Sequence, residues 1–156
     1  MSRDKFNQVA KSIPFDNSTN GFTATELQSA IEEIGASASP GFSFGRGSAG
    51  AGTWLNRVGE IPSNRAGVTI GINNPLITNV YTSTEDLQTY TLGVYQHDGN
   101  SINLSLLGTV SVTNARVGNF QVSFTATKGK QLAVKVISAT ASINNIGVDL
   151  ILKGNA

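Results

Sequence analysis

The sequence predicts a mainly β protein: an antiparallel β-sandwich of jelly-roll type, preceded by an N-terminal extended arm and one short helix. Apolar and polar residues alternate with a period of two through much of the chain after residue 53, as in strands with one buried face. Tight-turn dipeptides such as Asp98-Gly99 and Lys128-Gly129 separate these segments. A helical pattern with capping signals occurs near the N-terminus, which places the helix before the sheet.

The strand pattern is strongest in three segments and weaker in four others. We expect about seven or eight short strands, joined without intervening helices, and this arrangement favours a sandwich. The clearly alternating segments are Tyr90–Val94, Phe120–Ala126 and Ile146–Lys153, and the further candidates are Val68–Ile72, Leu76–Tyr81, Ile102–Val112 and Leu132–Ile137.

The predicted helix covers residues 23–35. Thr23 and Glu26 have the spacing of a capping box, and Gly35 lies where a left-handed C-terminal cap is expected. Its apolar residues form a narrow stripe like that of a coiled coil. Such a stripe can dock on the chain's own domain or join several copies of the chain. We expect a small parallel helical bundle between copies of the chain, with an interface made of Leu27, Ala30, Ile31 and Ile34.

Two segments flank this helix. Residues 1–22 have little periodicity and predict an extended attachment arm, with spaced apolar residues for contact with a partner: Phe6, Val9, Ile13 and Phe15. Residues 36–52 are rich in Gly, Ser and Ala and predict a flexible connector to a β-sandwich domain at residues 53–156. Phe42 and Phe44 are exceptional in this connector, and we expect them to pack on the β domain or on a neighbouring subunit.

The composition narrows the classes of partner. Only 13% of the 156 residues are charged, the net charge is +1, and the Lys and Arg residues are scattered, so no nucleic-acid partner is expected. The chain has no cysteine, which rules out disulfides and thiolate metal sites. Neither a signal peptide nor an apolar run of about 20 residues is visible, and we expect a protein made in the cytoplasm without a membrane partner.

The motifs of enzymes are present only as fragments. Gly41 to Gly45 matches G-x-S-x-G around Ser43, with Asp86 and His97 downstream, but a nucleophile elbow needs a strand before it and a helix after it. Gly45 to Gly50 matches G-x-G-x-x-G without the strand and helix that give this motif meaning. His97 is the only histidine, which excludes multi-histidine metal sites. We therefore expect a non-enzymatic protein without a metal or cofactor.

Trp54 has two interpretations. An exposed indole can stack on a sugar, in which case Tyr81, Tyr90 and Tyr95 would extend the stacking surface. Burial as an anchor beside the connector is the alternative, and it is the more common environment for tryptophan.

The segment from Phe15 to Glu33 carries a resemblance. Its run Phe-Asp-Asn-Ser-Thr-Asn-Gly-Phe-Thr-Ala-Thr, followed by Leu-Gln-Ser-Ala-Ile-Glu-Glu, resembles a segment near the N-terminus of tailed-bacteriophage head fibres, decoration proteins and tail fibres. The remainder, with Gly52-Thr53-Trp54-Leu55 and Gly129-Lys130-Gln131-Leu132, resembles β-rich domains of phage structural proteins. This resemblance implies a virion surface protein made in the bacterial cytoplasm, a trimeric capsid decoration or head-fibre protein whose partner is the major capsid protein. A tail-fibre or receptor-binding tip is the alternative.

Overall fold

The computed structural model describes residues 41–55, 69–99 and 104–154. The chain divides into two compact units, Met1–Ala38 and Ser39–Ala156, and every described residue belongs to the second unit. The predicted arm at residues 1–22 and the predicted helix at residues 23–35 lie outside the described residues.

The described residues form one antiparallel sheet of five strands, and they contain no helix. This result confirms the prediction of a mainly β, antiparallel fold. The strands are β1 (Gly41–Ala49), β2 (Leu76–His97), β3 (Ser105–Thr125), β4 (Gln131–Ala139) and β5 (Ile143–Lys153).

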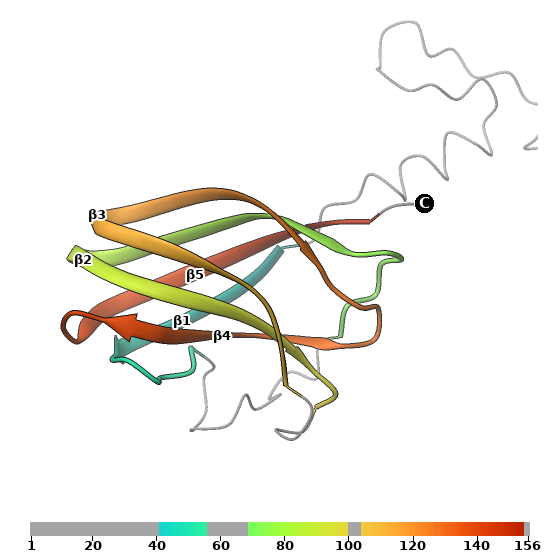
Figure 1. Ribbon diagram of the computed structural model, residues 1–156, viewed down its shortest axis with the longest axis horizontal. Helices are drawn as coiled ribbons and strands as arrows, with labels where there is room; N and C mark the ends of the chain where they lie inside the picture. The colour runs from blue at the N-terminus through green and yellow to red at the C-terminus, as the bar shows by residue number, and fades with distance from the viewer. Residues whose placement is uncertain (1–40, 56–68, 100–103, 155–156) are drawn as a thin grey trace, which may run out of the picture. The chain divides into compact units, whose positions relative to one another are not determined.

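Strand β2 is the centre of the sheet and changes partners along its length. It pairs with β3 along almost its whole length. On its other side, residues 76–83 pair with β5 and residues 90–97 pair with β4. Strand β1 then extends the sheet beyond β5. The sheet therefore has two halves, and β2 and β3 each contribute residues to both of them. Figure 1 shows these two strands turning back at the left of the view.

Four bends connect the two halves at one end of the sheet. In β2 the register shifts between Ser83 and Tyr90, and in β3 the facing Asn114 has a positive φ of 47°, which asparagine tolerates better than most residues. The segment between β4 and β5 makes the third bend. After β1, Gly52 with φ 84° turns the chain, and Trp54 then pairs with Lys135 in β4.

The hydrophobic core contains residues from both halves of the sheet. Val80 and Leu150 come from the half that contains β5, whereas Leu92 and Val134 come from the half that contains β4, and all four belong to one buried cluster. The two halves approach closely at Gly108, where an added Cβ atom would come within 2.2 Å of the Phe124 ring. Apolar residues from the two halves thus bury one another, which removes their surfaces from water.

Two local predictions were wrong. Residues 41–49, assigned to the flexible connector, form strand β1, and Phe42 and Phe44 pack against the core as expected. Glycine content suggested a linker, but the alternation of phenylalanine with small residues fits a strand once β5 supplies hydrogen-bond partners. Residues 69–72 are not in a strand. The other described strand candidates are confirmed, although pairs of them are continuous in β2 and β3.

A buried hydrogen bond links the two halves of β2. The hydroxyl groups of Thr82 and Tyr90 are 2.7 Å apart, and both residues are buried. Burial raises the pKa of the Tyr90 phenol, although hydrogen bonds from Thr82 and Thr84 act in the opposite direction. The phenol therefore remains neutral and serves as a structural contact across the bend.

Replacing Tyr90 with phenylalanine is expected to lower the free energy of unfolding by about 1–3 kcal/mol, because the buried Thr82 hydroxyl loses its partner. The double variant Thr82→Val/Tyr90→Phe should be less destabilised than the sum of the two single variants. Urea denaturation of all four proteins measures this coupling. Strict additivity would show that the hydroxyl pair contributes nothing to stability.

Candidate functional site

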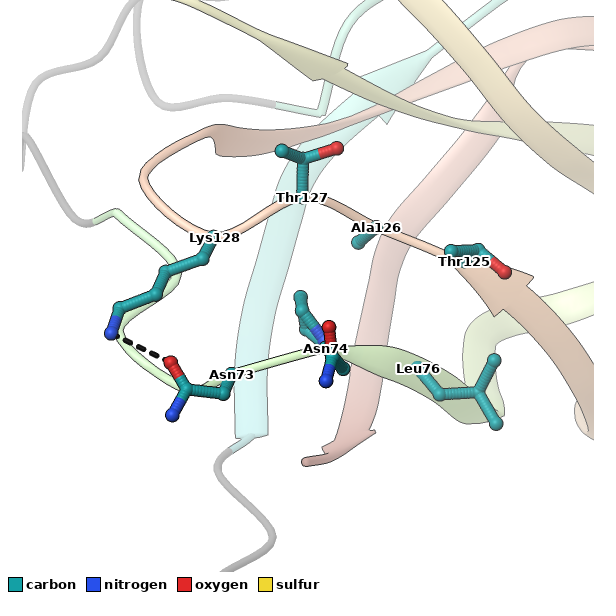
Figure 2. A pocket seen from close by; sticks show the side chains of 8 residues that line it. Asn73, Asn74, Leu76, Thr125, Ala126, Thr127 and Lys128 are labelled. Carbon is teal, nitrogen blue, oxygen red and sulfur yellow. Dashed lines mark hydrogen bonds between the residues drawn. The ribbon is translucent and has the colours of Figure 1, made fainter. Parts of the chain in front are cut away.

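An open groove lies at the end of the sheet opposite the bends. It has a volume of about 650 Å³ and is formed where β2 begins and β3 ends. The amide of Ala126 donates to the Pro75 carbonyl at 2.9 Å and holds the two walls together. Figure 2 shows these walls, with Asn73, Asn74 and Leu76 on one and Thr125, Ala126, Thr127 and Lys128 on the other. Pro75 also lines the groove.

Five of the eight residues that line the groove have polar side chains. Lys128 Nζ donates to Asn73 Oδ1 at 2.8 Å across its mouth, and Asn74 adopts a positive φ of 43°. Among the described residues that line it, none is a carboxylate, a histidine or an aromatic residue. Amides, hydroxyls and one ammonium group can bind neutral or anionic polar groups by hydrogen bonding. They provide no pair of nucleophile and base.

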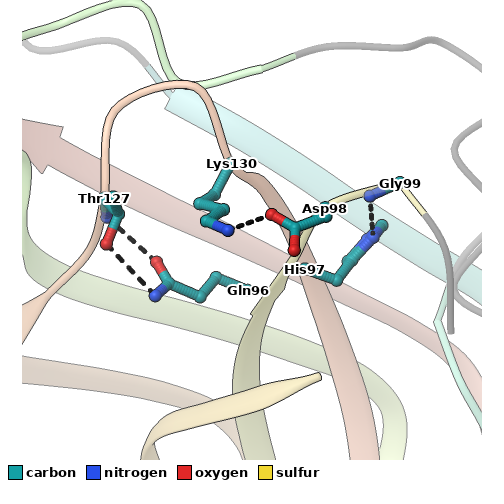
Figure 3. A network of polar contacts seen from close by, with 6 residues as sticks. All are labelled: Gln96, His97, Asp98, Gly99, Thr127 and Lys130. Carbon is teal, nitrogen blue, oxygen red and sulfur yellow. Dashed lines mark hydrogen bonds and ion pairs between the residues drawn. The ribbon is translucent and has the colours of Figure 1, made fainter. Parts of the chain in front are cut away.

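A polar network fastens the end of β2 beside this groove (Figure 3). Gln96 makes two hydrogen bonds to Thr127, accepting from its amide at 2.9 Å and donating to its hydroxyl at 3.2 Å. Lys130 forms an ion pair with Asp98. Since Thr127 also lines the groove, these contacts position one groove wall relative to β2.

His97 lies in the same network and is only 2% exposed. Its Nδ1 accepts a hydrogen bond from the Gly99 amide at 3.0 Å, so this nitrogen carries no proton. Burial lowers the pKa of His97, and the adjacent Asp98 carboxylate offsets part of this effect. The imidazole is therefore neutral near pH 7 and closes the turn that follows β2.

Acidification from about pH 7.5 to about pH 5 is expected to lower the melting temperature. The pKa of His97 is lower in the folded state than its ordinary value of 6.5, so the unfolded chain binds the proton first and stability falls as the pH drops through 6.5. Melting curves across this range measure the effect. A His97→Gln variant should have a flatter profile, and an equally steep profile in that variant would assign the pH dependence to other groups.

The residues of the hydrolase-like motif are not brought together. Ser43 lies within β1, and its hydroxyl donates to Asp149 Oδ1 at 2.6 Å. Asp86 lies in the bend in the middle of β2, whereas His97 is the last residue of that strand. The G-x-G-x-x-G match likewise lies in β1 and the turn that follows it, and no helix follows within the described residues. Neither motif has the geometry that its chemistry requires.

Trp54 is buried rather than presented as a platform, with 7% of its surface exposed. Tyr95 packs edge-on against it with ring centroids 5.0 Å apart, and Lys135 Nζ lies 5.1 Å from the indole centroid. Tyr90 belongs to the core, and Tyr81 is 40% exposed in the other half of β2. The four aromatic residues therefore do not form the single stacking surface that the sugar-binding interpretation needs.

The site residues predicted from the sequence and the groove occupy different parts of the chain. The predicted trimer interface and attachment residues lie outside the described residues: Leu27, Ala30, Ile31, Ile34, Phe6, Val9, Ile13 and Phe15. Sequence reasoning missed the groove. Its one available signal was the polar Asn73-Asn74-Pro75 turn, because the pairing of Leu76 with Thr125 that brings the two walls together is a tertiary contact.

No protein-family model matches the chain. A search of curated proteins also finds no significant match. Among the described residues, no three histidine, aspartate or glutamate side chains are grouped to hold a metal ion. The same part of the chain has no helix with the length and apolar character needed to span a bilayer.

Proposed function

We propose that this chain is a non-enzymatic structural protein of a bacteriophage virion, a trimeric decoration or head-fibre protein that binds and stabilises the capsid surface. The resemblance of the segment from Phe15 to Glu33 to phage head fibres and decoration proteins carries this proposal. A β domain with few charged residues supports it, because such a surface suits close packing against other proteins.

We further infer that the folded sheet is a jelly-roll sandwich. Division of the described strands at the bends gives eight segments in chain order: 41–49, 53–55, 76–83, 90–97, 105–112, 117–125, 131–139 and 143–153. If these segments are numbered 1 to 8 in chain order, the neighbouring strands of one half of the sheet are 1-8-3-6 and those of the other half are 2-7-4-5. This order follows from folding one four-stranded antiparallel ribbon in half. Jelly rolls of this kind occur in viral capsid proteins and in lectins.

In the proposed mechanism each part of the chain has a mechanical role. The arm, residues 1–22, lies on the capsid lattice and contacts the major capsid protein, and the helix at residues 23–35 gathers three chains. The β domain is displayed outward on the virion and adds buried area between capsid subunits. No nucleic acid, membrane or cofactor takes part in this mechanism.

Deletion of residues 2–20 is expected to abolish recovery of the protein with capsids, because the arm supplies the apolar contacts. Serine at Phe6, Val9, Ile13 and Phe15 together should have the same effect. Alanine at the polar arm residues Asn7, Gln8 and Ser12 is the matched control and should leave binding intact. Co-sedimentation with capsids measures binding, circular dichroism checks folding, and unimpaired binding by the deletion variant would overturn the assignment of the arm.

The groove favours one alternative function, a receptor- or glycan-binding tip. Its amides, hydroxyls and ammonium group are suited to hydrogen bonding with sugar hydroxyls or carboxylates. Glycan-array binding that is lost in an Asn74→Ala/Lys128→Ala variant would support this alternative. Capsid binding without any glycan binding supports the decoration function.

A further inference from the structure

The half of the sheet that contains β5 has two strand edges without a strand partner among the described residues. The half of the sheet that contains β5 has the order β1, β5, residues 76–83 of β2, and residues 117–125 of β3. β1 and residues 117–125 therefore form its two outer edges. Each edge presents a row of backbone N–H and C=O groups that can pair with another strand.

These edges lack the usual protection against pairing. Monomeric proteins place charges, proline or very short strands at such positions. Residues 117–125 contain neither a charged residue nor proline. β1 contains a single charge, Arg46, and its guanidinium donates to the carbonyls of Ser48 at 3.1 Å and Trp54 at 3.3 Å. Nothing in either strand opposes the approach of a second backbone.

The core is incompletely covered at the same two edges. Five apolar side chains there are only partly buried although they pack against the core: Phe42 and Phe44 on β1, and Phe120, Val122 and Phe124 on β3. All five belong to the inward faces of their strands. A neighbouring strand at each edge would remove the remaining aromatic surface from water.

The two edge strands have the same length and run in opposite directions, as antiparallel pairing requires. β1 has 9 residues, and the range 117–125 has the same length. Two strands, β5 and β2, lie between the outer strands, and every neighbouring pair is antiparallel, so β1 and β3 run in opposite directions. A second copy rotated about an axis along the strands can place its β3 beside β1 in antiparallel pairing, with both inward faces on the same side. Repetition of this contact closes a ring with cyclic symmetry.

We propose that residues 117–125 of one copy pair with β1 of a second copy, and that three copies close the ring. We call this contact between β1 and residues 117–125 the seam. The number of copies rests on the proposed function, whereas the seam rests on the two edges. The seam joins different surfaces of the two copies, so each protomer contributes β1 to one neighbour and β3 to the other.

Cysteine cross-linking of the full-length protein tests the seam, since the chain has no native cysteine. Ser43→Cys on β1 is combined in turn with Asn119→Cys, Gln121→Cys, Ser123→Cys or Thr125→Cys on β3. All five positions are exposed, and the four on β3 sample the possible registers. Cross-strand neighbours fall within the Cα separation that a disulfide needs. Under mild oxidation, at least one combination should convert most of the protein to a covalent trimer on a non-reducing gel.

The single-cysteine variants are the controls and should remain uncross-linked. Covalent dimers from a β3 single variant would show that β3 pairs with itself about a two-fold axis and would overturn the proposal. A trimer by light scattering without cross-linking in any combination would also overturn the seam, while the decoration function would stand. Cross-linked trimers of a protein that does not bind capsids would support the seam and refute the decoration function.

Discussion

Replacing Leu150 with alanine is expected to lower the free energy of unfolding by about 2–5 kcal/mol. Leu150 is 0% exposed and lies in β5, between Phe42 in β1 and Val80 in β2. The substitution removes buried apolar atoms and leaves a cavity in a core to which both halves of the sheet contribute. Urea denaturation followed by circular dichroism measures the change.

Leu87→Ala is the matched control for this prediction. Leu87 lies in the bend of β2 and is 58% exposed, so the same chemical change there should alter stability by less than about 0.5 kcal/mol. Similar losses in the two variants would contradict the location of the core between the halves of the sheet.

Under the proposed decoration function, particles that lack this protein are expected to assemble and package DNA, but to release the DNA at a lower temperature than complete particles. A protein that binds only the mature lattice stabilises it by mass action, and each copy contributes about 2.7 kcal/mol at a free concentration a hundredfold above its dissociation constant. Many bound copies add their contributions. Fluorescence of a DNA-binding dye during heating measures the temperature of release.

Adsorption to host cells separates the decoration function from the receptor-binding alternative. Decoration predicts normal adsorption with lowered heat stability in particles that lack the protein. A receptor-binding tip predicts the opposite pattern, with unchanged heat stability and lost adsorption. Addition of purified protein to the deficient particles should restore heat stability, and a failure to do so would contradict direct stabilisation of the capsid.

The success of the strand predictions depended on local alternation. Phe120–Ala126 and Ile146–Lys153 have an apolar residue at every second position, and a strand with one buried face is the backbone conformation that places all of these on one side. Most of these positions face the core in β3 and β5. The glycine turn at Gly129 was also predictable, because its positive φ of 84° is accessible to glycine at little cost.

The strand predictions failed where the conformation of a segment depends on the strand that pairs with it. Residues 41–49 have the composition of a linker, and they become a strand because β5 satisfies their hydrogen bonds and the core accepts Phe42 and Phe44. The same limit applies to the long strands. Polar residues between Ser83 and Tyr90 looked like a break between two strands, yet β3 follows β2 on both sides of the bend.

By itself, the sequence determined the antiparallel β class of the domain and the turn after β3, since both depend on residue types a few positions apart. The resemblance of the segment from Phe15 to Glu33 also comes from the sequence alone, and the proposed function depends on it. Only the tertiary structure decided that both halves of the sheet share one core, that Trp54 is buried, and that Asn73 and Lys128 share a groove. It also decided that β1 and β3 have edges without a strand partner among the described residues. These features depend on contacts between residues far apart in the chain, and local sequence patterns carry little information about such pairings.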